Sequence, residues 1–539
     1  MFRLKVQSQS NSCATVQSQS DSKINHRTDN KMVSLPFPLC VLAFLKLVSP
    51  VASSSILFTA GTIIAFDHEA NDLDVIRNGS ILIEQDRITG IWSNEKTPSV
   101  SIPPNTTVID AAGKIITPGF VDTHRHGWQT LFKTMFSNIT LPEYFGRFGE
   151  HASAGRIDAE QVYIGQLAGL YEALNAGTTT SLDHAHHTWS DETSWAGLNA
   201  SIDSGARVFW SYAFHEVANY TIAQQIENYR DIVNAAPERD TAVELGMAFD
   251  SFDNGSVDQE TVESIVNLAK EVNASVLTAH SGGGVYGNEN SPTTLQSLGI
   301  LNTSIPVVFS HASYITLRDT MLLRSTNQHV AITPESEMGF GLGRPSTNMI
   351  LDQVALGVDT HAFQSSDLVS QARLYLQSTR SAVTDELFKK WQIPKSTPMS
   401  VVQAFLLATR NGGLALRRPD LGVLSVGAKA DVVVWDGTSP GFLGWLDPVA
   451  AIILHSNVGD VEHVLVDGKF VKRNHRLVVG DYASVQSRFL EAARRVQDDW
   501  RQIPRPEFPE RSTTGALFAD SDQVDVVAGN GTGYGQLYV

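Results

Sequence analysis

Cysteine is almost missing from this sequence, which has only Cys13 and Cys40 among its 539 residues. Two cysteines near the amino terminus cannot supply a disulfide framework or a thiolate metal site, so any metal must be held by histidine and carboxylate. Basic residues are also scarce, with 40 Lys and Arg against 57 Asp and Glu and a net charge of −17. An acidic chain without a basic patch argues against nucleic acid and anionic membranes as partners.

The most apolar stretch near the amino terminus, residues 33–45, is far shorter than the ~20 residues of a bilayer span, so no stable membrane anchor is expected. It begins directly after Met32 and is followed by small residues at 51–53, which is the pattern of a signal peptide. We therefore predict a signal peptide over 32–53, with an internal buried helix as the alternative. Residues 1–31, rich in Ser and Gln, are predicted to be disordered or to reflect an incorrectly assigned start.

Nine Asn-X-Ser/Thr sequons are present, more than twice the number we expect by chance. With a signal peptide and no cysteine beyond it, they predict a secreted glycoprotein from a eukaryote such as a fungus. The sequon asparagines are Asn78, Asn105, Asn138, Asn199, Asn219, Asn254, Asn273, Asn302 and Asn530.

Two β-rich stretches flank a long middle segment. Residues 54–116 read as short strands separated by turns. Residues 416–482 contain an Asp467-Gly468 turn between alternating apolar residues, which is a strong hairpin signal. The middle segment covers 117–415, and residues 483–539 are predicted to form a helix followed by an extended tail.

The middle segment alternates strand-like runs with helical patterns, which predicts an α/β fold with a parallel sheet. The runs are ITPGFVDTH, GTTTSLDHA, RVFWSYAF, ELGMAFD, ASVLTAH, PVVFSHA, HVAITPE and VALGVDTHA. Eight such runs fit a (β/α)8 TIM barrel. An open doubly wound sheet is the rival, but no Gly-rich fingerprint follows the first run.

Histidines and an aspartate stand at the carboxyl ends of these runs, where barrel enzymes place their sites. His124 and His126, at i and i+2 on one strand, project to the same side. His280, His311 and Asp359 end the fifth, sixth and eighth runs. Each histidine alone is explained by hydrogen bonding at a strand end, but three imidazoles and a carboxylate together suit Zn²⁺, or less often Fe²⁺.

In this order the motifs resemble the amidohydrolase superfamily, in the branch of cytosine, guanine and S-adenosylhomocysteine-type deaminases and triazine hydrolases. The resemblance covers roughly residues 55–480 and rests on GKIITPGFVDTHRH (113–126), GTTT (177–180), His280, His311, Asp359 in LGVD, and GAKADVVVWD (427–436). It implies a barrel with a small β-sandwich domain built from both flanking segments. It also implies one zinc or iron ion per chain, bound by His124, His126, His280 and Asp359. Because ELGMAFD lacks the lysine that bridges two metals in other members, a single ion is expected.

The resemblance also assigns catalytic roles. Asp359 would accept a proton from metal-activated water, whose pKa falls toward ~7, and His311 would polarise the substrate. The glutamate that deaminases of this branch carry three residues after the strand-five histidine is replaced here by Gly283. We expect Glu337, just after the seventh run, to shuttle the proton instead, with Glu335 as the fallback. The alternative is that Glu337 only forms a salt bridge.

Several further residues are candidates for substrate binding. His184 and His186 lie in the cluster DHAHH of the second run, and His215 follows the third. Adjacent residues on a strand point to opposite faces, so only some of this cluster can face the site, and a second metal ion there is the weaker interpretation. Trp128 and Gln129 could stack on and hydrogen-bond a flat heterocycle, or simply pack.

The sequence therefore predicts a secreted metal-dependent hydrolase of carbon–nitrogen bonds other than peptide bonds, with deamination of an amino-substituted N-heterocycle as the leading reaction. Hydrolysis of an amide or carbamate, or of another leaving group on a heteroaromatic ring, is the alternative. The non-enzyme alternative is an inactive amidohydrolase-like scaffold, which has no reason to keep a ligand set. The expected partner is a small heterocyclic or amide substrate, and a homodimer is expected from the resemblance.

Overall fold

The computed structural model describes residues 55–96, 100–235, 241–253, 255–287, 289–343, 347 and 350–521. All of them belong to one compact unit, Ser53–Val539. The predicted signal peptide, the segment 1–31, the end of the tail and the sequons at Asn254 and Asn530 lie outside the described residues.

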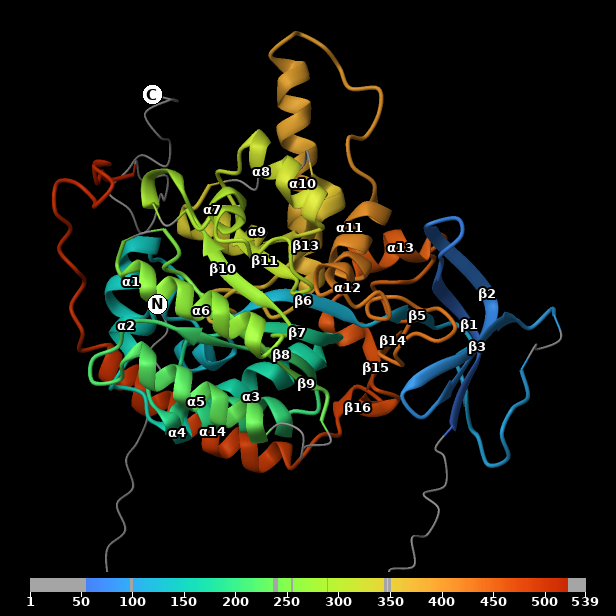
Figure 1. The fold of residues 1–539 in the computed structure, drawn as a ribbon. Coiled ribbons are helices and arrows are strands. Elements are labelled where there is room, and N and C mark those ends of the chain that lie inside the picture. The colour runs from blue at the N-terminus through green and yellow to red at the C-terminus, as the bar shows by residue number, and fades with distance from the viewer. Residues whose placement is uncertain are drawn as a thin grey trace, which may run out of the picture. The chain divides into compact units, whose positions relative to one another are not determined.

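Eight parallel strands form the centre of this unit, in sequential order around the sheet (Figure 1). They are β6 (Phe120–Arg125), β7 (Thr178–Ala185), β8 (Arg207–Phe214), β9 (Val243–Phe249), β10 (Leu277–Ser281), β11 (Val307–His311), β12 (His329–Ile332) and β13 (Val354–Leu356). The sheet closes because the backbone N–H groups of Val358 and Asp359, just beyond β13, donate to the His124 carbonyl at 3.1 and 2.8 Å. The predicted (β/α)8 fold is confirmed.

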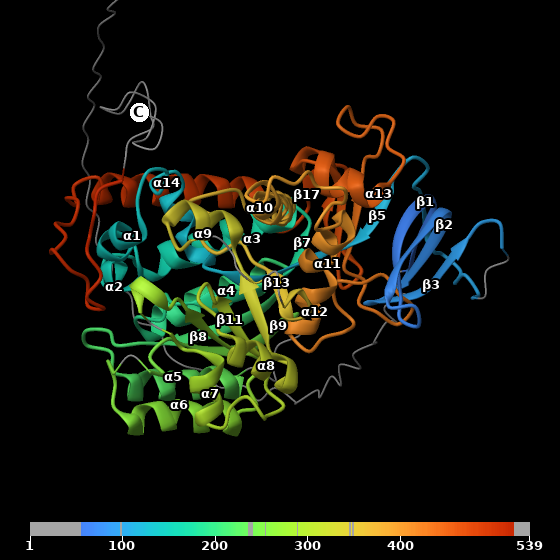
Figure 2. The ribbon, with the colours of Figure 1, turned by 90° about the horizontal axis from the view of Figure 1, so that it is seen from above.

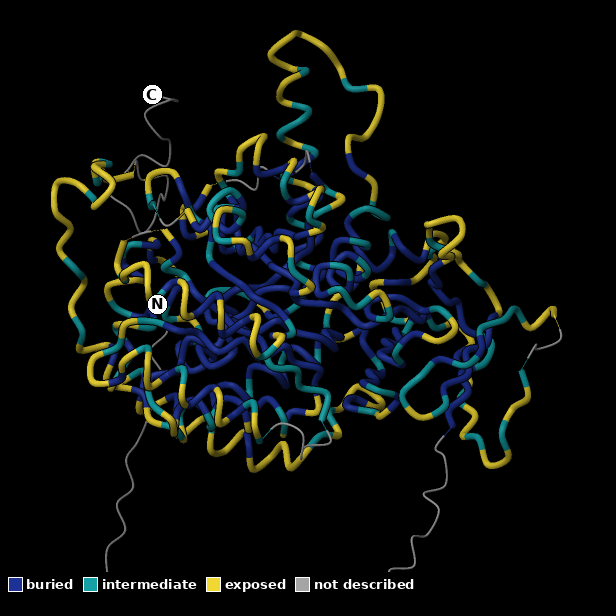
Figure 3. The backbone as a smooth tube through the Cα atoms, in the orientation of Figure 1, coloured by how far each residue is buried: buried dark blue, intermediate teal, exposed yellow. Residues whose placement is uncertain are grey.

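Helices surround the barrel strands, which are therefore buried on both faces and read as apolar runs in the sequence. Figure 3 shows the buried strands inside and the exposed residues on the outer helices and loops. The helices between the strands are α3 (Ala159–Asn175), α4 (Asp191–Asp203), α5 (Ile222–Ala235), α6 (Gln259–Glu271), α7 (Pro292–Ser297), α8 (Leu317–Thr326) and α9 (Pro334–Phe340). After β13 come α10 (Leu368–Phe388), α11 (Val401–Ala408) and α12 (Arg410–Ala415).

Shorter helices occupy the connections. They are η1 (Gly127–Phe132), α1 (Leu141–Arg147), α2 (Glu150–Ser153), η3 (Gly284–Tyr286), η5 (Leu351–Gln353), α13 (Pro448–Ala450), η6 (Ala451–His455) and η7 (Val458–Asp460). The last helix, α14 (Tyr482–Trp500), packs on α3 and η1 (Figure 2). Within the described part of the chain, no helix is long and apolar enough to cross a bilayer.

The two flanking segments form a β-rich domain together, as predicted. The first contributes β1 (Ser55–Asp67), β2 (Asp72–Glu84), β3 (Arg87–Ser93), β4 (Thr107–Asp110) and β5 (Ile115–Pro118). The second contributes β14 (Val432–Trp435), β15 (Val461–Val466), β16 (Lys469–Arg473) and β17 (Arg476–Leu477). All nine strands belong to one continuous sheet, joined where β5 pairs antiparallel with β14. Apolar residues from both segments fill a core of its own.

Candidate active site

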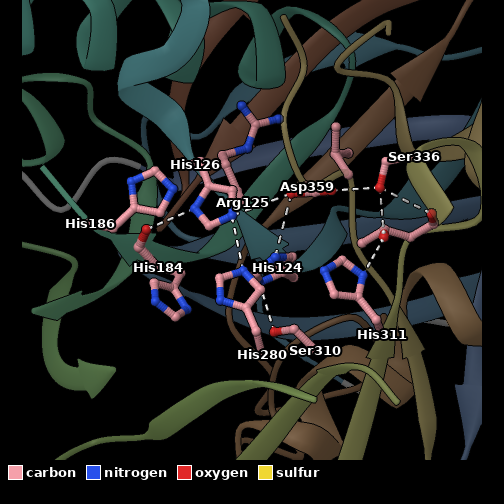
Figure 4. Close-up of polar contacts among 12 residues, drawn as sticks. His124, Arg125, His126, His184, His186, His280, Ser310, His311, Ser336 and Asp359 are labelled. Atoms are coloured by element: carbon pink, nitrogen blue, oxygen red, sulfur yellow. Dashed lines mark hydrogen bonds and ion pairs between the residues drawn. The ribbon is translucent and has the colours of Figure 1, made fainter. Parts of the chain in front are cut away.

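The carboxyl ends of the barrel strands bring the predicted metal ligands together (Figure 4). His124 lies on β6, His126 directly follows this strand, His280 lies on β10, and Asp359 follows β13. His311 ends β11 in a left-handed backbone conformation, with φ of 71°, and Asp359 has φ of 65°. Such conformations cost energy for residues with a side chain and often occur at functional sites. Both residues line the same cavity.

The ligand atoms are spaced as around a small cation. The Asp359 Oδ1 atom lies 3.6 Å from Nε2 of His124 and 3.3 Å from Nε2 of His126. The Nε2 atoms of His126 and His280 are 3.2 Å apart. His124, His184 and His280 form an overlapping group within ligand distance.

Neighbouring groups orient the imidazoles. The Nδ1 atom of His126 lies 3.0 Å from the His184 carbonyl oxygen, which only accepts, so this nitrogen carries the proton. The Nδ1 atom of His280 likewise donates to the Asp250 carboxylate at 2.7 Å. The Nδ1 atom of His124 contacts the Ser310 hydroxyl at 2.8 Å. Each ring therefore turns its Nε2 atom toward the common centre, as metal-binding histidines do.

This arrangement fits a cation. The buried Nε2 atom of His124 has no hydrogen-bond partner among the described residues. Burial lowers the pKa of His280, but the contact with the Asp250 carboxylate outweighs burial and raises this pKa to about 9. Burial opposes ionisation of Asp359, but the neighbouring His124 and His126 imidazoles hold its pKa well below the usual range. The residues present therefore fit a metal ion.

A cavity of about 410 Å³ opens over these residues. His126, His280, His311 and Asp359 lie at its floor. Its walls are largely apolar and aromatic, and include Leu141, Phe214, Phe249, Phe340 and Leu342. A volume of this size suits a small molecule rather than a polymer.

The predicted substrate-binding residues divide into two groups. His184, His186 and His215 line the cavity. Trp128 and Gln129 are fully buried and are not among the residues that line it. Each contacts a residue that lines the cavity: Trp128 donates a hydrogen bond to His186, and Gln129 donates one to Tyr144.

The predicted proton shuttles do not reach the cavity directly. Glu337 is buried behind His311, with its Oε1 atom 3.5 Å from the His311 Nδ1 atom. The same oxygen accepts the Thr333 backbone N–H at 2.8 Å. Glu335 points to α10, where its carboxylate accepts a hydrogen bond from Gln371 at 3.0 Å.

Sequence reasoning missed three residues that shape the site: Asp250, Ser310 and Tyr144. The sequence offered a signal for Asp250 and Ser310, because Asp250 is the last residue of the fourth run and Ser310 precedes His311. Tyr144 lies on α1, in a connection without strand or motif, and gave no signal.

Comparisons with known proteins agree with this fold. The 5'-deoxyadenosine deaminase of Methanosarcina acetivorans is 26% identical over 457 residues, which cover 83% of this chain and 98% of that protein. An adenosine deaminase from Xanthomonas campestris with bound zinc superimposes with a TM-score of 0.70 at 17% identity, covering 84% of this chain and 99% of that one. The zinc complex of an atrazine chlorohydrolase from Arthrobacter aurescens superimposes with a TM-score of 0.69 at 20% identity, covering 81% of this chain and 100% of that one.

The family model described as "Amidohydrolase family" matches residues 115–471. This range includes all eight barrel strands and extends into the flanking sheet on both sides. The resemblance drawn from the motifs is thereby confirmed, and the chain is a hydrolytic enzyme of the amidohydrolase family.

Proposed function

We propose that this enzyme deaminates an amino-substituted N-heterocycle by hydrolysis, using one Zn²⁺ or Fe²⁺ ion per chain. The observation that carries the proposal is the convergence of His124, His126, His280 and Asp359 beside a small aromatic cavity, which the last three of these residues line. Relatives named as deaminases of adenosine derivatives support the reaction, and zinc in the neighbouring structures supports the metal. When bound, the ion supplies a Lewis acid that lowers the pKa of a water molecule toward ~7.

Asp359 is oriented to accept the proton that the water loses. Its Oδ2 atom accepts a hydrogen bond from the Ser336 hydroxyl at 2.5 Å, which leaves Oδ1 to face His124 and His126. The neighbouring histidines keep this carboxylate ionised, so that it can accept a proton.

His311 and Glu337 act together in protonating the leaving amine. The Nδ1 atom of His311 contacts the Thr333 hydroxyl at 3.0 Å and faces the Glu337 carboxylate. The opposite edge of the ring faces the cavity, because His311 lines it and Glu337 lies behind. The shuttle proposed for Glu337 therefore runs through His311, which compensates for the glycine at position 283.

The test combines metal analysis with ammonia release. Purified protein is analysed for metal, and the metal-replete enzyme is offered purines, pyrimidines, pterins and triazines bearing an amino group. We expect about one zinc or iron per chain and ammonia from at least one class. Metal without ammonia release would favour hydrolysis of an amide, a carbamate or another leaving group. The absence of the usual glutamate at position 283 is consistent with that alternative. Protein that binds no metal would favour the inactive scaffold.

We also propose that the protein is secreted and glycosylated. The seven sequon asparagines in the described residues are all exposed. Expression in a fungal host should place the protein in the medium with a mass that falls after endoglycosidase treatment. Intracellular, unglycosylated protein would contradict this proposal. The homodimer expected from the resemblance stays a prediction, which light scattering tests.

A further inference from the structure

Two buried side chains fix the hydrogen-bonding character of the cavity wall. The first is Trp128, whose indole Nε1–H donates to the Nδ1 atom of His186 at 3.0 Å. An indole nitrogen can only donate, so this Nδ1 atom must be unprotonated. The proton of His186 therefore sits on Nε2, for which no acceptor is found among the described residues. Because His186 lines the cavity, this N–H is available to a ligand.

The second is Gln129, whose side-chain amide N–H₂ donates to the Tyr144 hydroxyl oxygen at 2.8 Å. The same nitrogen lies 3.5 Å from the Phe148 carbonyl oxygen, which fixes this side of the amide as the donor. Since the Tyr144 oxygen accepts from Gln129, its own hydrogen is directed elsewhere. Tyr144 also lines the cavity, and the described residues offer its hydrogen no acceptor.

Apart from its histidines, the charged residues that line the cavity are acidic. Glu150, Glu216 and Asp250 line it in addition to Asp359, whereas no lysine or arginine occurs among the described lining residues. Glu150 lies beside His151, with 3.4 Å between their side chains, and Glu216 is exposed at the rim. An anionic substituent that enters this cavity away from the metal ligands would meet like charge, with no lysine or arginine in the described lining to pair with it.

From these observations we propose that His186 and Tyr144 bind the substrate as two preset hydrogen-bond donors, in a site that selects uncharged or cationic heterocycles and rejects anionic ones. The donors match ring nitrogens and carbonyl oxygens, which are the acceptors of an N-heterocycle. Trp128 and Gln129 act as positioning residues behind them. This inference rests on the proposed function and names the class of its substrate.

Trp128→Phe tests the positioning role, and Trp189→Phe is the matched control. Trp189 packs against Trp128 with ring centroids 5.1 Å apart, and its indole nitrogen has no partner within the described chain. We expect Trp128→Phe to raise KM about tenfold with kcat changed less than about twofold, as loss of one hydrogen bond implies, and with metal content unchanged. Trp189→Phe should leave KM within about twofold. Equal changes in KM for the two variants would mean that Trp128 only packs against its neighbours, and would overturn its positioning role.

A double variant separates hydrogen bonding from structure. His186→Asn retains an N–H donor that does not depend on Trp128. If Trp128 acts through His186, Trp128→Phe should raise KM no further in the His186→Asn background. A further tenfold rise there would overturn the proposal.

The charge preference is tested with three probes of one ring system: adenosine, 5'-methylthioadenosine and adenosine 5'-monophosphate. We expect kcat/KM for the monophosphate to be at least about 100-fold below that of 5'-methylthioadenosine, whose substituent is uncharged and controls for size. The double variant Glu150→Gln, Glu216→Gln should narrow the difference. Equal rates for the two probes would overturn the inference.

Failure of the proposed function is distinguishable from failure of this inference. If no probe releases ammonia, deamination of these rings is refuted. Calorimetric titration of the metal-replete wild-type protein and of Trp128→Phe with the same probes then measures their binding directly. Preferential binding of 5'-methylthioadenosine, weakened in Trp128→Phe, would still support the donor pair, and equal binding of the monophosphate would overturn it.

Discussion

At the scale of single residues, Asp250 holds His280 in the orientation that its proposed role as a metal ligand requires. Its carboxylate accepts both the His280 backbone N–H and the His280 Nδ1–H, each at 2.7 Å. Its Oδ2 atom also lies 3.4 Å from the Nε2 atom of His184. A carboxylate behind a ligating histidine fixes the ring and raises its basicity.

Asp250→Asn should therefore weaken zinc affinity by about 10–100-fold, because the amide holds the His280 ring without its charge. Competition with a fluorescent chelator measures the affinity. Asp253→Asn is the control, since Asp253 bonds Asn290 and Thr294 in the same loop region without contacting His280. Unchanged zinc affinity in Asp250→Asn would show that the contact has no such role.

Glu337→Gln should slow turnover at least about tenfold while metal content stays the same, because the amide keeps the bond from the Thr333 backbone but cannot carry a proton. Glu335→Gln, two residues away and turned toward Gln371, should leave the rate nearly unchanged. Steady-state rates and metal analysis of both variants show which glutamate carries the proton. The reverse ranking would move the shuttle to Glu335, and unchanged rates in both would leave the proton to water.

At the scale of elements, strand ends could be predicted and connections could not. The eight apolar runs and the polar residue that follows each are local patterns, so β6 to β13 and His124, His126, His280, His311 and Asp359 were found from sequence. Tyr144 and Glu150 come from α1 and α2, whose path over the cavity depends on tertiary packing. For the same reason the sequence left Trp128 open between stacking on the ligand and simple packing, and did not indicate its hydrogen bond to His186.

The junction of β7 and α4 contains a buried histidine that makes the fold sensitive to acid. His187 is fully buried, and neither ring nitrogen has a partner in the described residues. The ring lies so close to Gly197 of α4 that an added Cβ would meet it at 2.0 Å. Burial lowers the pKa of His187 to about 3, so the folded protein excludes a proton that the unfolded chain binds near pH ~6.5.

His187 thus contributes stability that is intact above pH ~6.5 and is lost as the pH falls toward 3. As the pH falls over this range, the unfolding free energy of the wild-type protein should decrease by about 1.4 kcal/mol per pH unit more than that of His187→Leu. Urea titrations at several pH values measure both. The two proteins compared at pH 8 provide the reference, because His187 is neutral there in both states. Parallel pH profiles for the two proteins would contradict this assignment.

At the scale of the whole molecule, one buried ion pair ties the barrel to the flanking sheet. Arg207, on β8, donates to the Asp431 carboxylate at 3.0 and 3.2 Å and also contacts Asp467. Asp431 precedes β14 and accepts the Asp467 backbone N–H at 2.8 Å. Sequence patterns predicted β structure on both sides of the barrel, but not this pairing, since the partners are far apart along the chain.

Removal of one partner from a buried pair leaves an uncompensated charge, which is far more costly than loss of an exposed pair. Asp431→Ala should therefore lower the free energy of unfolding by about 3 kcal/mol, at the lower end for buried pairs because Asp467 still contacts Arg207. Asp352→Ala breaks the exposed pair with Arg324, whose side chains are 54% and 45% accessible, and should cost less than about 1 kcal/mol. Urea titrations of both variants measure the difference. Equal costs would mean that the barrel and the sheet do not depend on this contact for their stability.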